Sequence, residues 1–361
     1  MQKKIIALAI AGMVSVPAFA DPQVNFYGVV DAALVTVSGS GLSSNSVVES
    51  GGPGSTHLGV NASTDLGNGL KAIGVLEYGF NLTDNTGLAS VGARKKMIGV
   101  TSDAMGTLQA GWLPSEGYAF SLNFDPFAEG GADPMGAMIN GGGFLIGWTG
   151  GANHGDHAID YTTPDFNGLK FELGHQTAND AGGTGLVTPS GGKNNTGTLL
   201  SANYDTGPLS LGAVYATTSN AVSTNNQTEF ALGGSYDLTV AKLFATWQQG
   251  KYSNGLTGAA DPTANNSAMS LSATIPAGPG SVAASYASTS MKTNSNVNGS
   301  AYAVSYGYPW SKQATLYAAY EHVSNGSGSN KYSVLDGGAV GTLSGASASS
   351  NLLALGMNFH F

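Results

Sequence analysis

The last eleven residues, Asn351 to Phe361, read NLLALGMNFHF and decide the fold class. From Leu353 onward the large apolar side chains occupy every second position, and Ala354, Gly356, Asn358 and His360 lie between them. A helix would spread both sets around its circumference, whereas a strand places them on opposite faces. The segment is therefore predicted to be a strand with one apolar face and one small or polar face.

The same alternation recurs along the chain in runs of about ten residues, which is the length that a tilted transmembrane strand needs. The runs predict sixteen strands, at 22–37, 56–66, 69–82, 92–102, 107–113, 154–163, 168–178, 197–206, 208–217, 228–238, 241–252, 266–275, 280–290, 298–308, 312–324 and 351–361.

The connections fall into two length classes. Short ones are dense in turn residues, such as Leu66-Gly67-Asn68-Gly69 and Asp205-Thr206-Gly207-Pro208, while the stretches 38–55 and 114–153 represent the long Gly/Ser/Asn-rich class. A soluble β-sandwich also alternates, but its turns do not separate in this way. Short turns on one side and long loops on the other indicate an all-β fold, a transmembrane antiparallel β-barrel of the bacterial outer membrane. Sixteen strands leave an aqueous lumen.

Composition and charge agree with an exported chain. Lys3 and Lys4, the short apolar run after them and Ala18-Phe19-Ala20 resemble a cleavable signal peptide at 1–20, which leaves 21–361 as the barrel. The mature part would carry 11 basic and 22 acidic residues, a charge of −11, which argues against a nucleic-acid partner. The absence of cysteine excludes disulfides and thiolate metal sites.

Several stretches, in this order and spacing, resemble the trimeric general porins of Gram-negative bacteria, most closely the β-proteobacterial branch. They are Val24 to Asp31, Leu66 to Ala72 with Glu77, Gly106 to Leu108, Ile159 to Pro164, Ser311 to Gln313 followed by Leu316-Tyr317, and the terminal Phe361. The resemblance implies a homotrimer in outer-membrane lipid, without a cofactor, that passes ions and small hydrophilic solutes. It also implies that Phe361 is the signal by which the barrel-assembly machinery recognises the chain.

The sequence departs from that family in its arginines. Two positions at which the family usually places an arginine on the channel wall read Thr56-His57-Leu58-Gly59 and Gly111-Trp112 here, and Arg94 is the only arginine in the chain. The facing of Arg94-Lys95-Lys96 stays open because neither side is cleanly apolar. Trp112 also stays open between lumen and membrane interface, because a bulge after glycine can switch parity.

The segment 114–153 is the third long loop, which in porins folds into the channel and narrows it. It carries Glu116, Asp125, Glu129 and Asp133 and no Lys or Arg, and it is the candidate pore constriction. The opposing pore wall is predicted to offer five residues: Asp31, His57, Lys71, Glu77 and Arg94. Because low-dielectric walls focus the field of such acids, the channel is expected to lean to cations or to select weakly.

Other function classes have weaker support. His154, Asp156 and His157 resemble a metal cluster, but on a strand they do not converge, so no metal site is predicted. No Gly-x-Ser-x-Gly elbow or acid/base pair suggests an enzyme. A surface adhesin or receptor barrel and a substrate-specific channel remain alternatives; ion conduction across a planar bilayer would separate an adhesin from a porin.

Overall fold

The structure is a computed structural model of the chain. It describes residues 22–50, 52, 54–83, 92–177, 196–219, 227–252, 265–292, 294–335 and 343–361. The signal peptide expected at 1–20 lies outside these residues.

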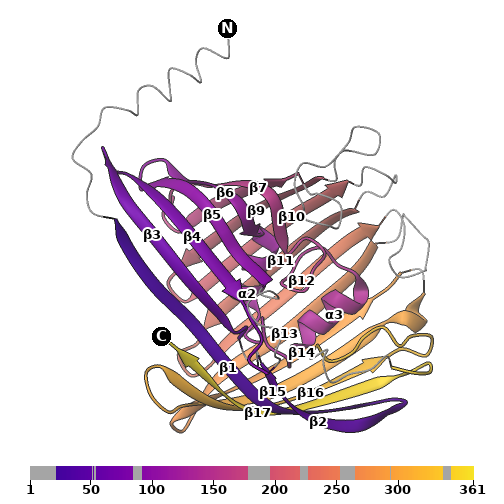
Figure 1. Ribbon diagram of the computed structural model, residues 1–361. Helices are drawn as coiled ribbons and strands as arrows, with labels where there is room; N and C mark the ends of the chain where they lie inside the picture. The colour runs from indigo at the N-terminus through magenta and orange to yellow at the C-terminus, as the bar shows by residue number, and fades with distance from the viewer. Residues whose placement is uncertain are drawn as a thin grey trace.

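The described residues form one antiparallel sheet that closes on itself (Figure 1). Residues 29–39 of β1 pair with β17, from Val29 opposite His360 to Gly39 opposite Ser350. Because the sheet is closed, it has no edge strand whose backbone N–H and C=O groups would be left unpaired in lipid. This pairing accounts for a stable barrel without disulfides. The strands are β1 (Gln23–Gly39), β2 (Leu42–Ser50), β3 (His57–Gly67), β4 (Leu70–Gly79), β5 (Gly92–Ser102), β6 (Gly106–Pro114), β7 (His154–Thr162), β8 (Leu169–Gln176), β9 (Thr196–Thr206), β10 (Leu209–Ser219), β11 (Gln227–Asp237), β12 (Lys242–Tyr252), β13 (Asn265–Ala277), β14 (Gly280–Ser290), β15 (Gly299–Pro309), β16 (Ala314–Asn325) and β17 (Ser349–His360).

The seventeen described strands occupy sixteen strand positions around the barrel, as the sequence predicted. β2 and β3 lie along the same edge of β1, because β3 pairs with residues 23–29 of β1 and β2 with residues 32–39. Together they fill the second strand position. The prediction that 38–55 is wholly a loop is wrong, since β2 lies within it. Its sequence LSSNSVVES is mostly polar, so no apolar alternation marked it.

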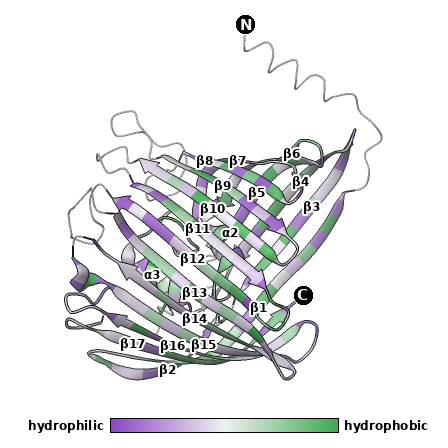
Figure 2. Ribbon diagram, turned by 180° about the vertical axis from the view of Figure 1, so that it is seen from behind, coloured by the Kyte–Doolittle hydropathy of each residue, from purple (hydrophilic) through white to green (hydrophobic). Residues whose placement is uncertain are grey.

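The two faces of the barrel follow the predicted period of two. On β17, Leu353 and Leu355 are 48% and 52% exposed, while Leu352 and Ala354, which alternate with them, are 1% and 5% exposed. Figure 2 shows the same alternation of hydrophobic and hydrophilic residues along the strands. The exposed apolar side chains form the outer surface, as expected for a barrel whose outer face contacts lipid.

The short turns have the backbone that their sequences require. Between β3 and β4, Asn68 and Gly69 have φ angles of 54° and 74°. These left-handed values match the right-handed twist of a tight hairpin, and Asn-Gly is the dipeptide that adopts them at least cost. The turn thereby fixes the register of Lys71 and Glu77 on β4.

The segment between β6 and β7 folds back into the barrel as two short helices, α2 (Glu116–Phe124) and α3 (Pro134–Gly142) (Figure 1). Both have sequence-encoded caps, since Ser115 accepts from the backbone N–H of Tyr118 and Asp133 from that of Gly136. α2 contacts β8 to β12, and α3 contacts β13 to β16. A further short 3-10 helix, η3 (Ser295–Val297), lies outside the barrel wall strands. None of the described helices is long and apolar enough to cross a membrane.

Apolar side chains hold this segment against the inner wall. Phe120 and Phe124 of α2 pack with Leu199, Val214 and Ala231 of the wall. The ring of Phe124 lies so close to Gly212 that a Cβ there would meet it at 2.3 Å. Around α3, a second cluster joins Met135, Met138 and Ile139 to small wall residues such as Ala287 and Ala301. Small wall residues therefore make room for the helices.

Candidate functional site

One ion cluster joins the third loop to the opposite wall. The Arg94 Nε donates to Glu77 Oε1 at 2.8 Å, and its Nη2 donates to Glu129 Oε1 at 2.7 Å. Glu77 is on β4, Arg94 on β5 and Glu129 in the loop between α2 and α3. The side chains are only 15–19% exposed. Three of the predicted pore residues thus meet where the loop crosses to the wall, and we call this group the crossing cluster.

A bulge brings Arg94 into the cluster. Glu77 pairs with Lys95 and Tyr78 pairs with Ala93, which leaves Arg94 without a partner residue in the ladder. Such a bulge re-aims the extra side chain, here toward Glu77 and Glu129. Lys96 is exposed and pairs with Leu76, which is 54% exposed on the outer face. The structure therefore resolves the facing that the sequence left open: Arg94 faces inward and Lys96 outward.

Aromatic hydroxyls complete the hydrogen bonding of the crossing cluster. Tyr27 donates to Glu77 Oε2 at 2.7 Å, and Arg94 Nη2 also donates to the Tyr118 hydroxyl oxygen at 3.1 Å. Tyr27 lies across Gly59, its register partner, where a Cβ would meet the ring at 2.2 Å. The His57 ring lies 6.3 Å from that of Tyr27 and its Nδ1 bonds to Ser55 O at 2.7 Å. His57 thus borders the cluster through Tyr27.

Trp112 lies on the inner side. Gly111 has a φ of 146°, the β6–β7 register shifts between Gly111 and Leu113, and a Cβ at Gly111 would meet Lys96 O at 2.0 Å. The bulge turns the Trp112 ring onto His154, 5.7 Å away and nearly parallel, and His154 lies 5.0 Å from Tyr118.

The three residues that resembled a metal cluster, His154, Asp156 and His157, have different surroundings. His154 belongs to the Trp112 stack, whereas His157 is 53% exposed and lies 3.1 Å from Asp156. Within the described part of the chain, no group of three metal-ligating side chains is close enough to hold an ion.

Asp125 and Asp133 do not line open water. They are 5% and 0% exposed. Asp133 caps α3 and accepts from the Trp148 indole, and Asp125 accepts from the Phe127 N–H at 2.9 Å. Burial, followed by the charge of Asp133, raises the pKa of Asp125, and burial also raises the pKa of Asp133.

Glu116 is also buried, in the first turn of α2. Its carboxyl packs over Gly174, and its Oε1 has no hydrogen-bond partner among the described residues. Burial raises the pKa of Glu116 to about 8. Three of the four loop acids are therefore held in packed protein, and Glu129 is the one that reaches the wall arginine.

The remaining predicted wall residues lie away from the crossing cluster. Asp31 is fully buried at the closing seam and accepts from Gly52 N, Tyr317 OH and Asn358 Nδ2 at 2.5, 2.7 and 2.9 Å. Lys71 is exposed beside the Asn68-Gly69 turn, about 20 Å along β4 from Glu77 at the rise of a strand.

Phe361, the predicted assembly signal, is 54% exposed, and its backbone exchanges two hydrogen bonds with Gly28 at 3.0 and 3.1 Å. The end of the chain is thereby tied to β1 while its ring remains on the surface.

Two buried wall acids beside the loop were not predicted from the sequence, and one of them anchors the loop. Glu229 of β11 is 2% exposed and accepts from the backbone N–H groups of Leu145 and Ile146 at 2.7 and 3.2 Å. Glu321 of β16 is fully buried near Asp125 and Asp133. Glu229 has the parity opposite to the exposed Phe230, and Glu321 has the parity of the buried Tyr317 and Val323. An acid on the inner parity was therefore a signal available in the sequence.

A closed barrel with an apolar outer face, a polar interior and a loop folded across it defines an outer-membrane channel of the porin type. A family model described as "Gram-negative porin" matches residues 7–328. The chain belongs to this family, whose members are proteins of the bacterial outer membrane.

Similar proteins agree. Outer membrane porin protein 32 of Delftia acidovorans is 30% identical over 331 residues, 88% of each chain. A solved anion-selective porin from Comamonas acidovorans superposes with a TM-score of 0.77 at 24% identity and covers 94% of this chain and 100% of its own. The trimer form of OmpT of Vibrio cholerae has a TM-score of 0.63 at 16% identity, over 95% of this chain and all of its own.

Proposed function

We propose that the protein is a diffusion channel for ions and small hydrophilic solutes whose narrowest part is the crossing cluster, and that it leans weakly to cations. Family and fold are those of non-enzymatic channels. The main support for this proposal is the crossing cluster, where ion pairs rather than apolar packing join the third loop to the wall. Polar side chains at the narrow part of a wet lumen set which solutes pass.

The charge count at the crossing cluster supports a lean to cations. Two carboxylates, Glu77 and Glu129, enclose one guanidinium, Arg94. The lean is weak for two reasons. The cluster carries about one net negative charge, and Asp125, Asp133 and Glu116 are buried groups whose pKa values are raised. His57 and Trp112 stand where the family usually has arginine.

The similar porin from Comamonas acidovorans is described as anion-selective. At 24% identity that likeness reports the fold, so its selectivity does not transfer to a chain with a single arginine. The two chains are therefore expected to differ in the sign of their preference, and the sign is measurable.

The test is the reversal potential of the purified channel across a planar bilayer in a KCl gradient at low salt, where charges are least screened. We expect a permeability ratio of K⁺ to Cl⁻ above one. Glu129→Gln should bring the ratio toward one and Arg94→Gln should raise it, each by roughly twofold because one charge changes at a narrow, focusing site. Anion preference in the unmodified channel, or shifts of the same sign in both variants, would refute the cation lean.

We also propose that the protein assembles as a homotrimer. The support is family membership and the similar trimeric form of OmpT. In such an assembly each subunit keeps its own lumen, because each barrel closes on itself through β1 and β17.

A further inference from the structure

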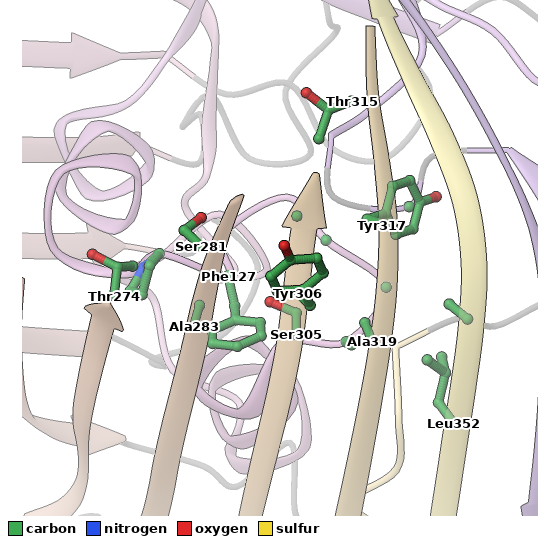
Figure 3. Close-up of a pocket in the computed structure, with 17 residues that line it drawn as sticks. Phe127, Thr274, Ser281, Ala283, Ser305, Tyr306, Thr315, Tyr317, Ala319 and Leu352 are labelled. Atoms are coloured by element: carbon green, nitrogen blue, oxygen red, sulfur yellow. The ribbon is translucent and has the colours of Figure 1, made fainter. Parts of the chain in front are cut away.

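A cavity of about 230 Å³ lies between the loop segment 126–132 and the inner wall of β13 to β17 (Figure 3). It is separate from the crossing cluster: neither Glu77, Arg94 nor Glu129 lines it. Its wall includes residues close to the short turns at 277–280 and 309–314, so it faces the short-turn end of the barrel.

Small side chains in register hollow out the wall. Thr274 pairs with Ala283, Ala283 with Ser305, and Ser305 with Ala319, so four strands place a small inward residue in one row. In the next row Ser281 pairs with Gly307. Paired Cβ atoms lie about 5 Å apart, so small residues in adjacent rows leave a trough.

Two of the three aromatic residues that line the cavity, Phe127 and Tyr317, bound the trough; the third is Tyr306. Phe127 comes from the loop, and Figure 3 shows its ring over the wall beside Ala283 and Ser305. The phenol of Tyr317 stands toward the β17 side and is fixed by its hydrogen bond to Asp31 at 2.7 Å. The backbone N–H of Phe127 donates to the carboxyl of Asp125, which ties the main chain of this residue to the buried loop acids.

The chemistry of the lining is neutral. Among the described residues that line the cavity none is charged. Thr274, Ser281, Ser305 and Thr315 present hydroxyl groups for which the described part of the chain provides no hydrogen-bond partner. An aromatic ring can pack against an apolar face of a ligand, and the hydroxyl groups beside it can form hydrogen bonds with hydroxyl groups on the edge of the same ligand.

We propose that this cavity is a subsite for an uncharged, hydroxylated ring of monosaccharide size, held on its way through the channel. The inference rests on the proposed diffusion function and names a solute class for it. The volume is below the roughly 300–1,000 Å³ of sites for drug-sized ligands, which favours a single ring. An ionic solute would lose water here without gaining a counter-charge, which is costly.

The experiment measures block of the KCl current by glucose, added to a bilayer that holds the full channel. Sorbitol, an open-chain molecule with a similar set of hydroxyls, is the matched control solute. We expect glucose to reduce the current with a saturable concentration dependence, and sorbitol to reduce it only in proportion to solution viscosity. If glucose and sorbitol behave alike, the subsite is refuted.

Substitutions in the cavity wall test whether glucose blocks the current by binding in this cavity. Ser305→Leu fills the trough and should weaken glucose binding at least tenfold, whereas Val304→Leu adds its carbon on the outer face, where Val304 is 47% exposed, and should change nothing. Ser305→Ala, which removes one hydroxyl without added bulk, should cost about two- to tenfold.

Saturable block that survives unchanged in both Ser305 variants would refute the proposed location. A channel that conducts KCl but shows no saturable block overturns this inference alone. Absence of ion conduction would overturn the proposed function itself.

Discussion

Arg94 shows how one residue can couple a loop to a wall. It is the single arginine of the chain, and the bulge on β5 gives its guanidinium access to Glu77, Glu129 and Tyr118 at once. Removal of one partner from a largely buried network leaves an uncompensated charge, and the cost reaches about 3–5 kcal/mol in fully buried cases. At 15–19% exposure, water screens part of that cost here. The crossing cluster thus both holds the loop and carries charge.

Glu116 gives a pH prediction at the residue scale. Its pKa is raised by burial to about 8, against about 4.5 when unfolded, so between these values the folded chain binds more protons than the unfolded chain. The contribution of Glu116 to stability is therefore present below pH 4.5 and is lost as the pH rises toward 8. Glu116→Gln, which cannot ionise, should raise the apparent unfolding temperature at pH 8 by several degrees and flatten this part of the pH profile.

The readout is the thermal loss of barrel structure in detergent at pH 5 and pH 8. Asp103→Asn, which neutralises an exposed acid in a turn, is the control and should leave the profile unchanged. If Glu116→Gln kept the pH dependence of the unmodified protein, burial of this carboxyl would not be its cause.

At the scale of elements, the strands followed from the sequence because side-chain period and turn chemistry are local. The Asn68-Gly69 turn and the alternation of β17 needed no distant contact. β2 did not follow, because its strand character comes from pairing with β1 rather than from its own polar sequence. The burial of Asp125 and Asp133 also depends on the tertiary fold and could not be predicted from local sequence. The local sequence Asp133-Pro134 does, however, match a helix N-cap followed by the first helical residue.

The candidate site could be predicted from the sequence only in part, because some of its geometry depends on contacts between distant residues. Parity predicted that Glu77 lies on the inner face, but the inward turns of Arg94 and Trp112 come from bulges at Glu77/Tyr78 and Gly111/Leu113. A bulge adds one residue and reverses parity, and the sequence alone does not place it. Loop acids looked alike in the sequence, and their burial depends on which wall residues are small enough to receive the loop.

The end of β17 carries a prediction about assembly. Phe361 keeps its ring on the outer surface while its backbone pairs with Gly28 of β1. We expect Phe361→Asp to reduce the amount of folded protein in the outer membrane several-fold, because the apolar terminus that the assembly machinery is expected to recognise is replaced by a charge. Phe361→Trp keeps a large aromatic ring and should retain most of the yield. Heat-modifiable mobility on gels of outer-membrane fractions measures both, and full yield of Phe361→Asp would show that the ring is no signal.

For the whole molecule, the sheet closes within a single chain through β1 and β17. The proposed trimer would therefore not be needed to form a lumen. The mass of the detergent-extracted protein, from light scattering corrected for bound detergent, should be three times that of one chain. A monomeric mass would leave the barrel intact and remove the proposed assembly.

If the protein is a diffusion channel, water fills the lumen beside the third loop. The decisive measurement is single-channel conductance in a planar bilayer over a range of KCl concentrations. We expect discrete, ohmic steps whose size rises nearly in proportion to the bulk conductivity of the salt solution, because the ions keep their water and meet only a weak net charge. Purified, folded protein that inserts into the bilayer and yet passes no current would contradict it.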